Sequence, residues 1–363
     1  MSKNILIIGP FPLPTTGVSL ANEVVAKHLE YSTEYNVVTL NTSFSSFDEK
    51  LGTFSFKKLW FYLKLNLSVY KLFKAQIVYV TPGQTFFGVL KYSIFIIIAS
   101  LLKTPIVQHI HGNYLGRQYE LLTGLKRKIF HFLMSRTTIG IVLSSSLESN
   151  FTPFIPVNDI YVLNNFVIEP LFFDDKILEN KNYEGLNIVY LSNLMVEKGI
   201  LDLLDALEII EKNNIKYSAK IAGNIASENR AIIQLKLSRL KHTDYVGVVN
   251  EEQKVNLLKW SNIFVLPTYY TMEGQPISIL EAMATGNLVL TTAHAGIPDI
   301  FEDGKNGFFV EKQNPQYIAA KLIEIKNNQP LIKEIAYFNH HKARAEYNVS
   351  TFITCLKEIL SNS

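Results

Sequence analysis

Short apolar runs alternate with stretches of helical periodicity along this 363-residue chain. The first run, Asn4 to Ile8, ends at Gly9-Pro10, and apolar residues recur at helical spacing from Val18 to Leu29. A short continuous apolar run is typical of a strand buried on both faces, and a period near 3.6 is typical of an amphipathic helix. Strand, glycine loop and helix in this order predict a doubly wound α/β domain, whose ligands bind at the carboxyl ends of the strands.

The same order of elements begins again near residue 186. Leu186 to Leu191 reads as a strand, Ser192 to Gly199 as a loop and Ile200 to Ile210 as a helix. Residues 169–185 contain Asp, Lys, Asn and Pro with little periodicity, which is typical of a linker. We therefore expect two Rossmann-like α/β domains, with these boundaries: an N-terminal domain 1–168, a linker 169–185, a C-terminal domain 186–345 and a last helix within 346–363.

The strongest pattern lies between Pro267 and Val289. An apolar run ends at Pro267, a loop of small and polar residues follows, and Pro276 suits the first turn of a helix. Glu273 lies in the loop and Glu281 about a turn and a half into the helix. The free N–H groups of the first turn and the helix dipole favour an anion such as a phosphate. Carboxylates on either side of that site suit the hydroxyls of a nucleotide sugar; alternatively, both are solvated acids at a helix end.

The composition is that of a globular protein, with 48% hydrophobic and 18% charged residues. The net charge of +3 is uneven, because residues 1–165 carry 15 Lys and Arg against 8 Asp and Glu. A basic, aromatic N-terminal half suggests an anionic partner such as a membrane surface, and without a base-stacking motif we expect no nucleic acid. The single cysteine, Cys355, excludes an internal disulfide and fits a cytoplasmic protein. The chain opens directly into a strand, so we expect no signal peptide.

Two stretches bear on membrane contact. Residues 54–74 mix apolar and aromatic side chains with lysines, which predicts one or two basic amphipathic helices. Their lysine face lies either in water above a packed core or against anionic headgroups. Residues 86–102 are strongly apolar, but the uninterrupted run from Tyr92 is about half the ~20 residues that a spanning helix needs. We expect a buried or partly lipid-facing helix there, and no transmembrane segment.

The stretch EGQPISILEAMATGNLVLTTAHAGIPDIFEDGKNGFFV, residues 273–310, resembles the donor-site signature of retaining glycosyltransferases of family 4. The agreement rests on Glu273-Gly274, Glu281 with the Ala-Met-Ala that follows it, Gly286 and Asn306-Gly307. It covers about forty contiguous residues, and weaker agreement runs through nearly the whole chain. The resemblance implies the glycogen-synthase-like GT-B fold: two Rossmann-like domains facing across a cleft, with the C-terminal helix crossing back to the N-terminal domain.

The resemblance also implies retaining transfer of a hexose or N-acetylhexosamine from a nucleotide sugar, with UDP favoured over GDP, and without a metal or other cofactor. An Asp-x-Asp motif and a His/Cys cluster at ligand spacing are both missing from the sequence, which agrees with that expectation. In the C-terminal domain it assigns the ribose to Glu281 and the diphosphate to Lys198 and the Ile277-Ser278 backbone and hydroxyl. The sugar would be surrounded by Glu273, Gly274, Gln275 and Pro276. The base would meet the backbone near Val248.

One family residue is missing. The family has Gly-Arg-Leu and then Glu-Lys-Gly after the first strand of the C-terminal domain. Lys198-Gly199 matches, but Asn193 stands where the arginine is expected, and an amide cannot clamp a phosphate as a guanidinium does. Either another cation replaces it, for which Arg230 is the candidate, or the transition state is less well stabilised and turnover is slow.

In the N-terminal domain, a His-Gly pair follows the strand Pro105–Ile110. The family histidine at this point reaches the donor sugar near the reacting carbon, and His111 matches it, with His109 on the same side of the strand as the rival. Gly17, in the first loop, is the candidate for a glycine near the donor phosphates or the acceptor, unless it is a plain turn glycine. This domain would bind a saccharide acceptor. Its basic, apolar character favours a lipid-linked oligosaccharide on the cytoplasmic membrane face, as in bacterial O-antigen or capsule assembly.

Two alternatives remain open at this point. A sugar-nucleotide epimerase or hydrolase of the same fold would act without an acceptor. A sugar- or lipid-binding protein that kept the fold and lost turnover is the other alternative, and Asn193 is the residue that favours it.

Overall fold

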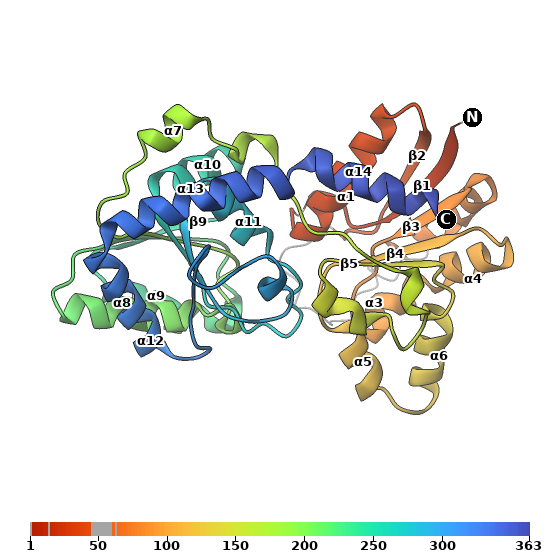
Figure 1. The fold of residues 1–363 in the computed structure, drawn as a ribbon. Coiled ribbons are helices and arrows are strands. Elements are labelled where there is room, and N and C mark those ends of the chain that lie inside the picture. Colours follow the sequence, from red (N-terminus) through yellow and green to blue (C-terminus); the bar gives the residue numbers. More distant parts are fainter. Residues whose placement is uncertain (1, 14, 45–59, 62–63) are drawn as a thin grey trace. The chain divides into compact units, whose positions relative to one another are not determined.

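The computed structural model describes residues 2–13, 15–44, 60–61 and 64–363. The chain forms two compact units (Figure 1). Unit 1 comprises Met1–Asn165, Met272–Gln275 and Ser350–Ser363, and unit 2 comprises Phe166–Thr271 and Pro276–Val349. Each unit is built on a six-stranded sheet in which every pair of neighbouring strands is parallel. The expected fold class, two Rossmann-like α/β domains, is confirmed.

The sheet of unit 1 has the strand order β2-β1-β3-β4-β5-β6. Its elements, in chain order, are β1 (Lys3–Gly9), α1 (Gly17–Tyr31), β2 (Tyr35–Asn41), the 3₁₀-helix η1 (Leu67–Lys74), β3 (Ile77–Val80), α3 (Phe86–Leu90), α4 (Ser93–Leu101), β4 (Ile106–Ile110), α5 (Leu115–Leu121), α6 (Gly124–Met134), β5 (Ile139–Val142), η2 (Ser145–Asn150), η3 (Val157–Asp159) and β6 (Ile160–Val162). The central strands β3, β4 and β5 are buried along their whole length, which explains why they read as continuous apolar runs.

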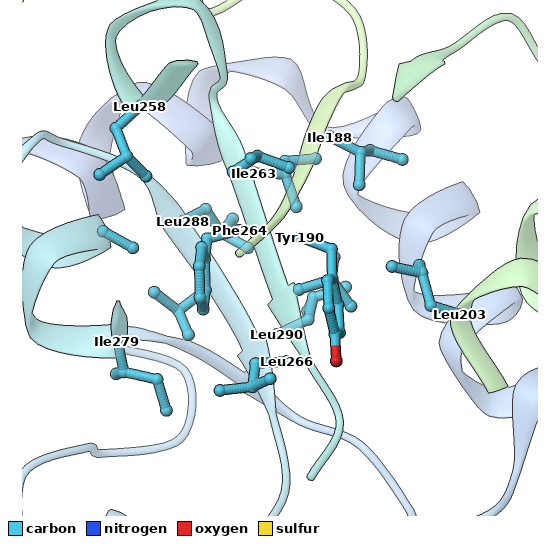
Figure 2. Close-up of a cluster of buried hydrophobic side chains, with 14 of the residues drawn as sticks. Ile188, Tyr190, Leu203, Leu258, Ile263, Phe264, Leu266, Ile279, Leu288 and Leu290 are labelled. Atoms are coloured by element: carbon cyan, nitrogen blue, oxygen red, sulfur yellow. The ribbon is translucent and has the colours of Figure 1, made fainter. Parts of the chain in front are cut away.

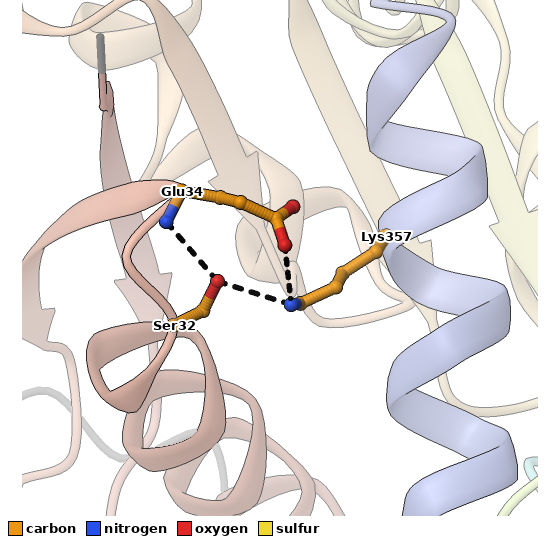
Figure 3. Close-up of polar contacts among 3 residues, drawn as sticks. All are labelled: Ser32, Glu34 and Lys357. Atoms are coloured by element: carbon orange, nitrogen blue, oxygen red, sulfur yellow. Dashed lines mark hydrogen bonds and ion pairs between the residues drawn. The ribbon is translucent and has the colours of Figure 1, made fainter.

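The last helix, α14 (Val349–Ser361), belongs to unit 1 from Ser350 onward. It buries Leu356 and Leu360. Figure 3 shows the polar contact that accompanies this packing: the Lys357 ammonium donates to the Ser32 hydroxyl at 3.0 Å and to the Glu34 carboxylate at 2.9 Å. A half-exposed ion pair of this kind contributes little, so the buried leucines hold the helix in place. The chain therefore returns to the N-terminal unit at its end, as expected.

The sheet of unit 2 has the order β12-β11-β10-β7-β8-β9. Its elements are η4 (Glu169–Leu171), α7 (Asp175–Glu179), β7 (Asn187–Leu191), η5 (Val196–Lys198), α8 (Ile200–Lys212), β8 (Ser218–Ala222), η6 (Ser227–Asn229), α9 (Arg230–Leu237), β9 (Thr243–Gly247), α10 (Glu251–Trp260), β10 (Ile263–Leu266), α11 (Ile277–Ala284), β11 (Leu288–Thr291), η7 (Ile297–Asp299), β12 (Gly307–Phe309), α12 (Pro315–Asn327) and α13 (Gln329–Glu346). Figure 2 shows part of its core, where Phe264 and Leu266 of β10 lie among apolar side chains of β7, β11 and α11.

Residues 169–185, expected as a linker, are packed into unit 2. Leu171, Phe172 and Tyr183 join its hydrophobic core. The buried Lys181 ammonium donates to the backbone carbonyls of Leu258 at 3.0 Å and Thr285 at 2.7 Å, and burial lowers its pKa. The segment has little periodicity but is nonetheless anchored, because most of its apolar residues are buried.

The basic stretch 54–74 lies partly outside the described residues, which leave out 54–59, with Lys57 and Lys58, and 62–63. Its last eight residues form η1, a 3₁₀-helix rather than the expected α-helix. The apolar stretch 86–102 forms two short helices, α3 and α4, interrupted near Lys91. In the described part of the chain, no helix has the length and apolar character required to cross a bilayer.

Candidate active site

In unit 2 the chain changes direction across the sheet between β7 and β10. The strands β7, β8 and β9 extend to one side and β10, β11 and β12 to the other. The loops that follow two such strands diverge and leave a crevice at the carboxyl ends, which is where ligands bind in open parallel sheets. Here the loops are residues 192–199, after β7, and 267–271, after β10. The candidate donor residues of both loops therefore lie at the point of the sheet best suited to a ligand.

Several contacts join these two loops. The Tyr269 amide donates to the Glu197 carbonyl at 2.8 Å, and the Lys198 ammonium lies 5.1 Å from the centre of the Tyr270 ring. Gly199 has φ +76°, and a Cβ there would lie 2.3 Å from the carbonyl oxygen of Pro267. Glycine is therefore required next to Lys198 by both the backbone conformation and the close approach. Lys198 thus lies at the switch point, the place between β7 and β10 where the chain changes direction across the sheet. The contacts between the two loops hold it there.

Asn193 lies in the same loop and its side chain is exposed. The Tyr190 hydroxyl donates to its backbone carbonyl at 3.1 Å, so the backbone of the loop is tied to β7 while the Asn193 amide faces solvent. The loop also pairs with the next connection through a bridge between Leu194 and Ile225. Arg230 follows that connection as the exposed first residue of α9. The proposed substitute cation thus comes from the neighbouring connection of the same unit.

The N-terminus of α11 is the expected phosphate site. Pro276 is the residue before the helix, which begins at Ile277. Ile277 and Ser278 are partly exposed, whereas every later residue of the helix is buried. The first turn is thus the most accessible part of α11, and its N–H groups carry the positive end of the helix dipole.

Glu281 is buried, with 5% of its surface exposed, and it is ion-paired with Lys254 of α10. Lys254 could not be singled out from the sequence, because a lysine on a polar helix such as α10 gives no signal. A carboxylate this deeply buried is costly unless it is paired. Lys254 donates to one carboxylate oxygen, Oε1, and therefore fixes the orientation of the Glu281 side chain.

Val248 follows β9 at the edge of the sheet, and its side chain is 70% exposed. The preceding Gly247 has φ +76°, so the backbone turns sharply at the end of the strand. Nothing in this geometry identifies a base, since recognition by backbone groups leaves no side-chain trace.

In unit 1, His111 lies directly after β4, and its ring contacts that of His109 at an interplanar angle of 34°. The ring centres are 4.0 Å apart, and the Tyr79 hydroxyl is 2.6 Å from Nδ1 of His109. The Nε2 atoms of both rings are buried and make no hydrogen bond to any described residue. Burial lowers the pKa of His111 to about 4 and, together with His111, holds the pKa of His109 well below its usual value. His109 is therefore engaged with Tyr79, and His111 is the histidine at the strand end.

The short segment Met272–Gln275 carries Glu273 and packs with unit 1. A Cβ on Gly274 would lie 2.8 Å from the His111 carbonyl oxygen, so the two backbones touch. Gln84 holds the segment from the other side: its Oε1 accepts from the Tyr114 amide at 2.6 Å, and its Nε2 donates to the Met272 carbonyl at 3.3 Å. Glu273, 7% exposed, precedes Gly274, whose backbone touches that of His111. The segment that carries one catalytic candidate is thus packed against the backbone of the other.

The Gln275 side chain, expected near the sugar, is committed to the protein instead. Its Nε2 donates to the Leu143 carbonyl and to the Asn164 side chain, both at 2.9 Å, and its Oε1 accepts from the Asn165 amide at 2.6 Å. The Asn165 side chain also donates to the Gln275 carbonyl at 2.7 Å. With these bonds made and 3% exposure, Gln275 anchors the segment that carries Glu273. The expectation that Gln275 lies around the sugar is therefore corrected for its side chain, which is held inside the protein.

Gly17 is the exposed first residue of α1. The helix is capped by Thr16, whose hydroxyl accepts from the Ser19 amide at 3.1 Å while the Ser19 hydroxyl accepts from the Thr16 amide at 2.7 Å. This reciprocal cap explains why the helix starts here.

No three His, Cys, Asp or Glu side chains in the described residues are grouped so as to hold a metal ion.

The lowered pKa of His111 gives a testable pH dependence of stability. Between pH 6.5 and 4 the unfolded chain binds a proton that the folded chain does not, so stability falls as the pH falls. At pH 5 we expect a loss of about 2 kcal/mol from this group relative to pH 7.5. Urea unfolding of wild type and His111→Asn at both values measures it. The variant should lose less stability on acidification than wild type, and the loss that remains is the part due to His109. Equal losses in the two proteins would contradict the lowered pKa of His111.

Comparison with known proteins shows what the chain is similar to. Residues 173–342 match the family described as glycosyl transferases group 1. The chain is 28% identical over 144 residues to the putative colanic acid biosynthesis glycosyltransferase WcaL of Salmonella typhimurium, covering 38% of this chain and 36% of that protein. It is 25% identical over 248 residues to the capsular polysaccharide biosynthesis glycosyltransferase CapM of Staphylococcus aureus, covering 64% and 65%. The matches therefore span about a third to two thirds of the lengths of these relatives.

Among solved structures, HepE of Anabaena in complex with UDP aligns over 99% of this chain and 100% of its own, with a TM-score of 0.75 and 17% identity. At that identity the likeness shows the fold, and the fold is GT-B. Residues 173–342 thus match the group 1 glycosyl transferases, and the whole chain has the GT-B fold.

Proposed function

We propose that this protein is a retaining glycosyltransferase that moves a hexose or N-acetylhexosamine from a nucleotide sugar, a UDP-sugar in preference to a GDP-sugar, to a saccharide acceptor. We further propose that the acceptor is lipid-linked and that the reaction serves bacterial surface polysaccharide assembly. The observation that carries the proposal is the cation at the switch point of unit 2. Lys198 lies there next to Tyr270 and on a loop joined to residues 267–271, where a diphosphate is expected in this architecture.

The chemistry follows from the groups of each unit. In unit 2, Lys198 and the N–H groups of Ile277 and Ser278 would neutralise the diphosphate as it leaves, so a divalent ion is not needed for that charge. Glu281 would accept hydrogen bonds from the ribose hydroxyls. In unit 1, His111 is neutral near pH 7 because its pKa is about 4, so it can exchange hydrogen bonds with sugar hydroxyls but adds no positive charge. Glu273 would supply a carboxylate from the segment whose backbone contacts that of His111.

The relatives support the donor and the process. HepE of Anabaena was solved with UDP and with UDP-glucose. WcaL and CapM are named for colanic acid and capsular polysaccharide biosynthesis. UDP-glucose or a similar hexose donor and a growing surface polysaccharide are therefore the first substrates to test.

Calorimetric binding of UDP and GDP with a chelator present tests the donor site. We expect UDP to bind without metal, and Glu281→Ala to weaken binding roughly 10- to 100-fold because a charged hydrogen-bond acceptor is lost. Lys254→Met should weaken it roughly tenfold and should also reduce the preference for UDP over 2′-deoxy-UDP, since Lys254 acts by positioning Glu281. Lys236→Met, which breaks the ion pair with Asp205 on the same unit, is the matched control.

The outcomes separate the alternatives. No binding of either nucleotide would contradict the donor site and favour a protein that kept the fold without turnover. UDP binding with release of free sugar, unchanged by any acceptor, would favour a hydrolase. An unaltered preference for UDP over 2′-deoxy-UDP in Lys254→Met would remove the positioning role of that lysine.

A further inference from the structure

Large apolar side chains are exposed in unusual density on one part of unit 1. Twelve of those exposed within the described residues lie between residues 60 and 132, and several are more than two thirds exposed, including Leu67 at 74%, Phe73 at 69%, Phe87 at 69%, Leu101 at 77% and Leu125 at 71%. The twelve are Trp60, Leu67, Tyr70, Phe73, Phe87, Ile94, Ile97, Leu101, Leu102, Leu121, Leu125 and Phe132. Exposed apolar side chains that gather on one part of a protein mark an interaction site.

These side chains belong to neighbouring helices. η1 packs against α4. The helices α4 and α3 pack against α6, and α5 also packs against α6 (Figure 1). On α4, Ile94, Ile97 and Leu101 recur at helical spacing and share one face. On α6, Leu125 and Phe132 are two turns apart and lie on one face with Lys128. We call the surface made by η1, α3, α4, α5 and α6 the basic apolar face.

The same stretch carries almost only positive charge. Residues 60–136 contain ten Lys and Arg and a single acid, Glu120, in a chain whose total charge is +3. Glu120 is already paired with Arg117, at 3.4 Å. The rest of the chain must therefore be acidic overall, which concentrates the positive field on this part of unit 1.

A groove of about 700 Å³ runs along α6, and its lining combines apolar side chains with positive charge. It is lined by Tyr119, Gly124, Arg127, Lys128, His131, Phe132, Ser135 and Arg136. The guanidinium groups of Arg127 and Arg136 lie 4.5 Å from the ring centres of Tyr119 and Phe132 respectively. Cations stacked on aromatic rings, with no acidic residue in the lining, suit an anionic headgroup above an apolar layer.

We propose that the basic apolar face docks unit 1 on an anionic lipid bilayer. A protein partner would have to match many unpaired cations with acids of its own, whereas a bilayer supplies negative headgroups and an apolar interior at the same surface. Exposed Leu, Phe and Trp side chains would enter the headgroup region while the lysines and arginines contact phosphates. Docking on a bilayer would bring unit 1 to a lipid-linked acceptor. Only this purpose of the docking rests on the proposed function.

Flotation with lipid vesicles tests it. The full chain is mixed with vesicles of phosphatidylcholine alone or with an equal part of phosphatidylglycerol, at low and high salt. We expect binding to the anionic vesicles only, weakened by salt. Lys126→Gln with Lys128→Gln should lower the partition coefficient roughly 25-fold, about fivefold for each cation near the surface. Leu101→Glu with Leu125→Glu should reduce it at least as much.

The matched control is Leu235→Glu with Phe338→Glu, which charges exposed apolar residues of unit 2 and should leave vesicle binding unchanged. The proposal fails if wild type does not bind anionic vesicles, or if the control pair weakens binding as much as Leu101→Glu with Leu125→Glu. It also fails if that variant instead separates a self-associated form in sedimentation, because the face would then join two copies. The vesicles contain neither donor nor acceptor, so UDP binding measured in parallel separates this result from the proposed activity.

Discussion

Replacing Glu273 by glutamine is expected to lower the rate of sugar transfer roughly 100- to 1,000-fold. Retaining transfer passes through a transition state with positive charge on the sugar ring, and a carboxylate in a dry site stabilises that charge. Glu273 meets the requirement because it is 7% exposed and because its segment is held on both sides, by Gln84 at Met272 and by the hydrogen bonds of Gln275. Steady-state transfer from UDP-glucose and related donors measures the loss.

Two control measurements show whether the variant keeps its fold and its affinity for UDP. The free energy of unfolding should be unchanged, since glutamine has the same shape as glutamate. UDP affinity should also persist, because the diphosphate is assigned to groups of unit 2. Glu302→Gln, an exposed acid of the same signature stretch that pairs with Lys305, should transfer sugar normally. Full activity in Glu273→Gln would sink its assignment as a catalytic residue.

Replacing Lys198 by methionine is expected to weaken UDP binding roughly 10- to 100-fold. The loss is that of a charge-assisted bond to the diphosphate in the crevice between the loops after β7 and β10. Because negative charge grows on the leaving diphosphate, transfer should fall by more than binding does. Isothermal titration and kcat/KM separate the two effects. Lys212→Met, a 71% exposed lysine at the end of α8, is the control.

Asn193→Arg belongs with this experiment. The Asn193 side chain is exposed on the loop that carries Lys198, so a guanidinium has room to reach toward the same ligand. If the site lacks a cation, the variant should gain activity and should partly rescue Lys198→Met. A loss of activity in Asn193→Arg would mean that the site is built around the amide, and Arg230→Gln would then test whether Arg230 is the missing cation.

The pattern of the sequence alone determined most of the fold. Buried parallel strands are continuous apolar runs, and helices such as α1 and α8 carry a 3.6-residue period, because both reflect burial of local structure. The segment around Glu273 and Glu281 also could be found from the sequence, since the spacing between a strand end, a loop and a helix start is a property of the local chain. Lys198-Gly199 is similar: the glycine is required by a positive φ and by contact with Pro267.

Contacts between distant parts of the chain had to come from the tertiary structure. Lys254 and Glu281 are 27 residues apart, on helices whose packing depends on the order of the strands between them. Gln275 was expected at the sugar because it belongs to the signature stretch, but its amide is used by Leu143, Asn164 and Asn165, whose position no local pattern reveals. The segment 169–185 looked like a linker because periodicity does not report anchoring by a few buried side chains.

The basic apolar face shows the same division. The positive charge of the N-terminal half was readable from the sequence, and so were the apolar stretches. Whether an apolar side chain of η1, α4 or α6 is buried or exposed depends on which helices cover it, and that is decided when the sheet order brings those helices together. Local chemistry therefore determined which elements form and which residues are candidates for the site, whereas the tertiary structure decided which side chains meet, because those contacts join positions far apart in the chain.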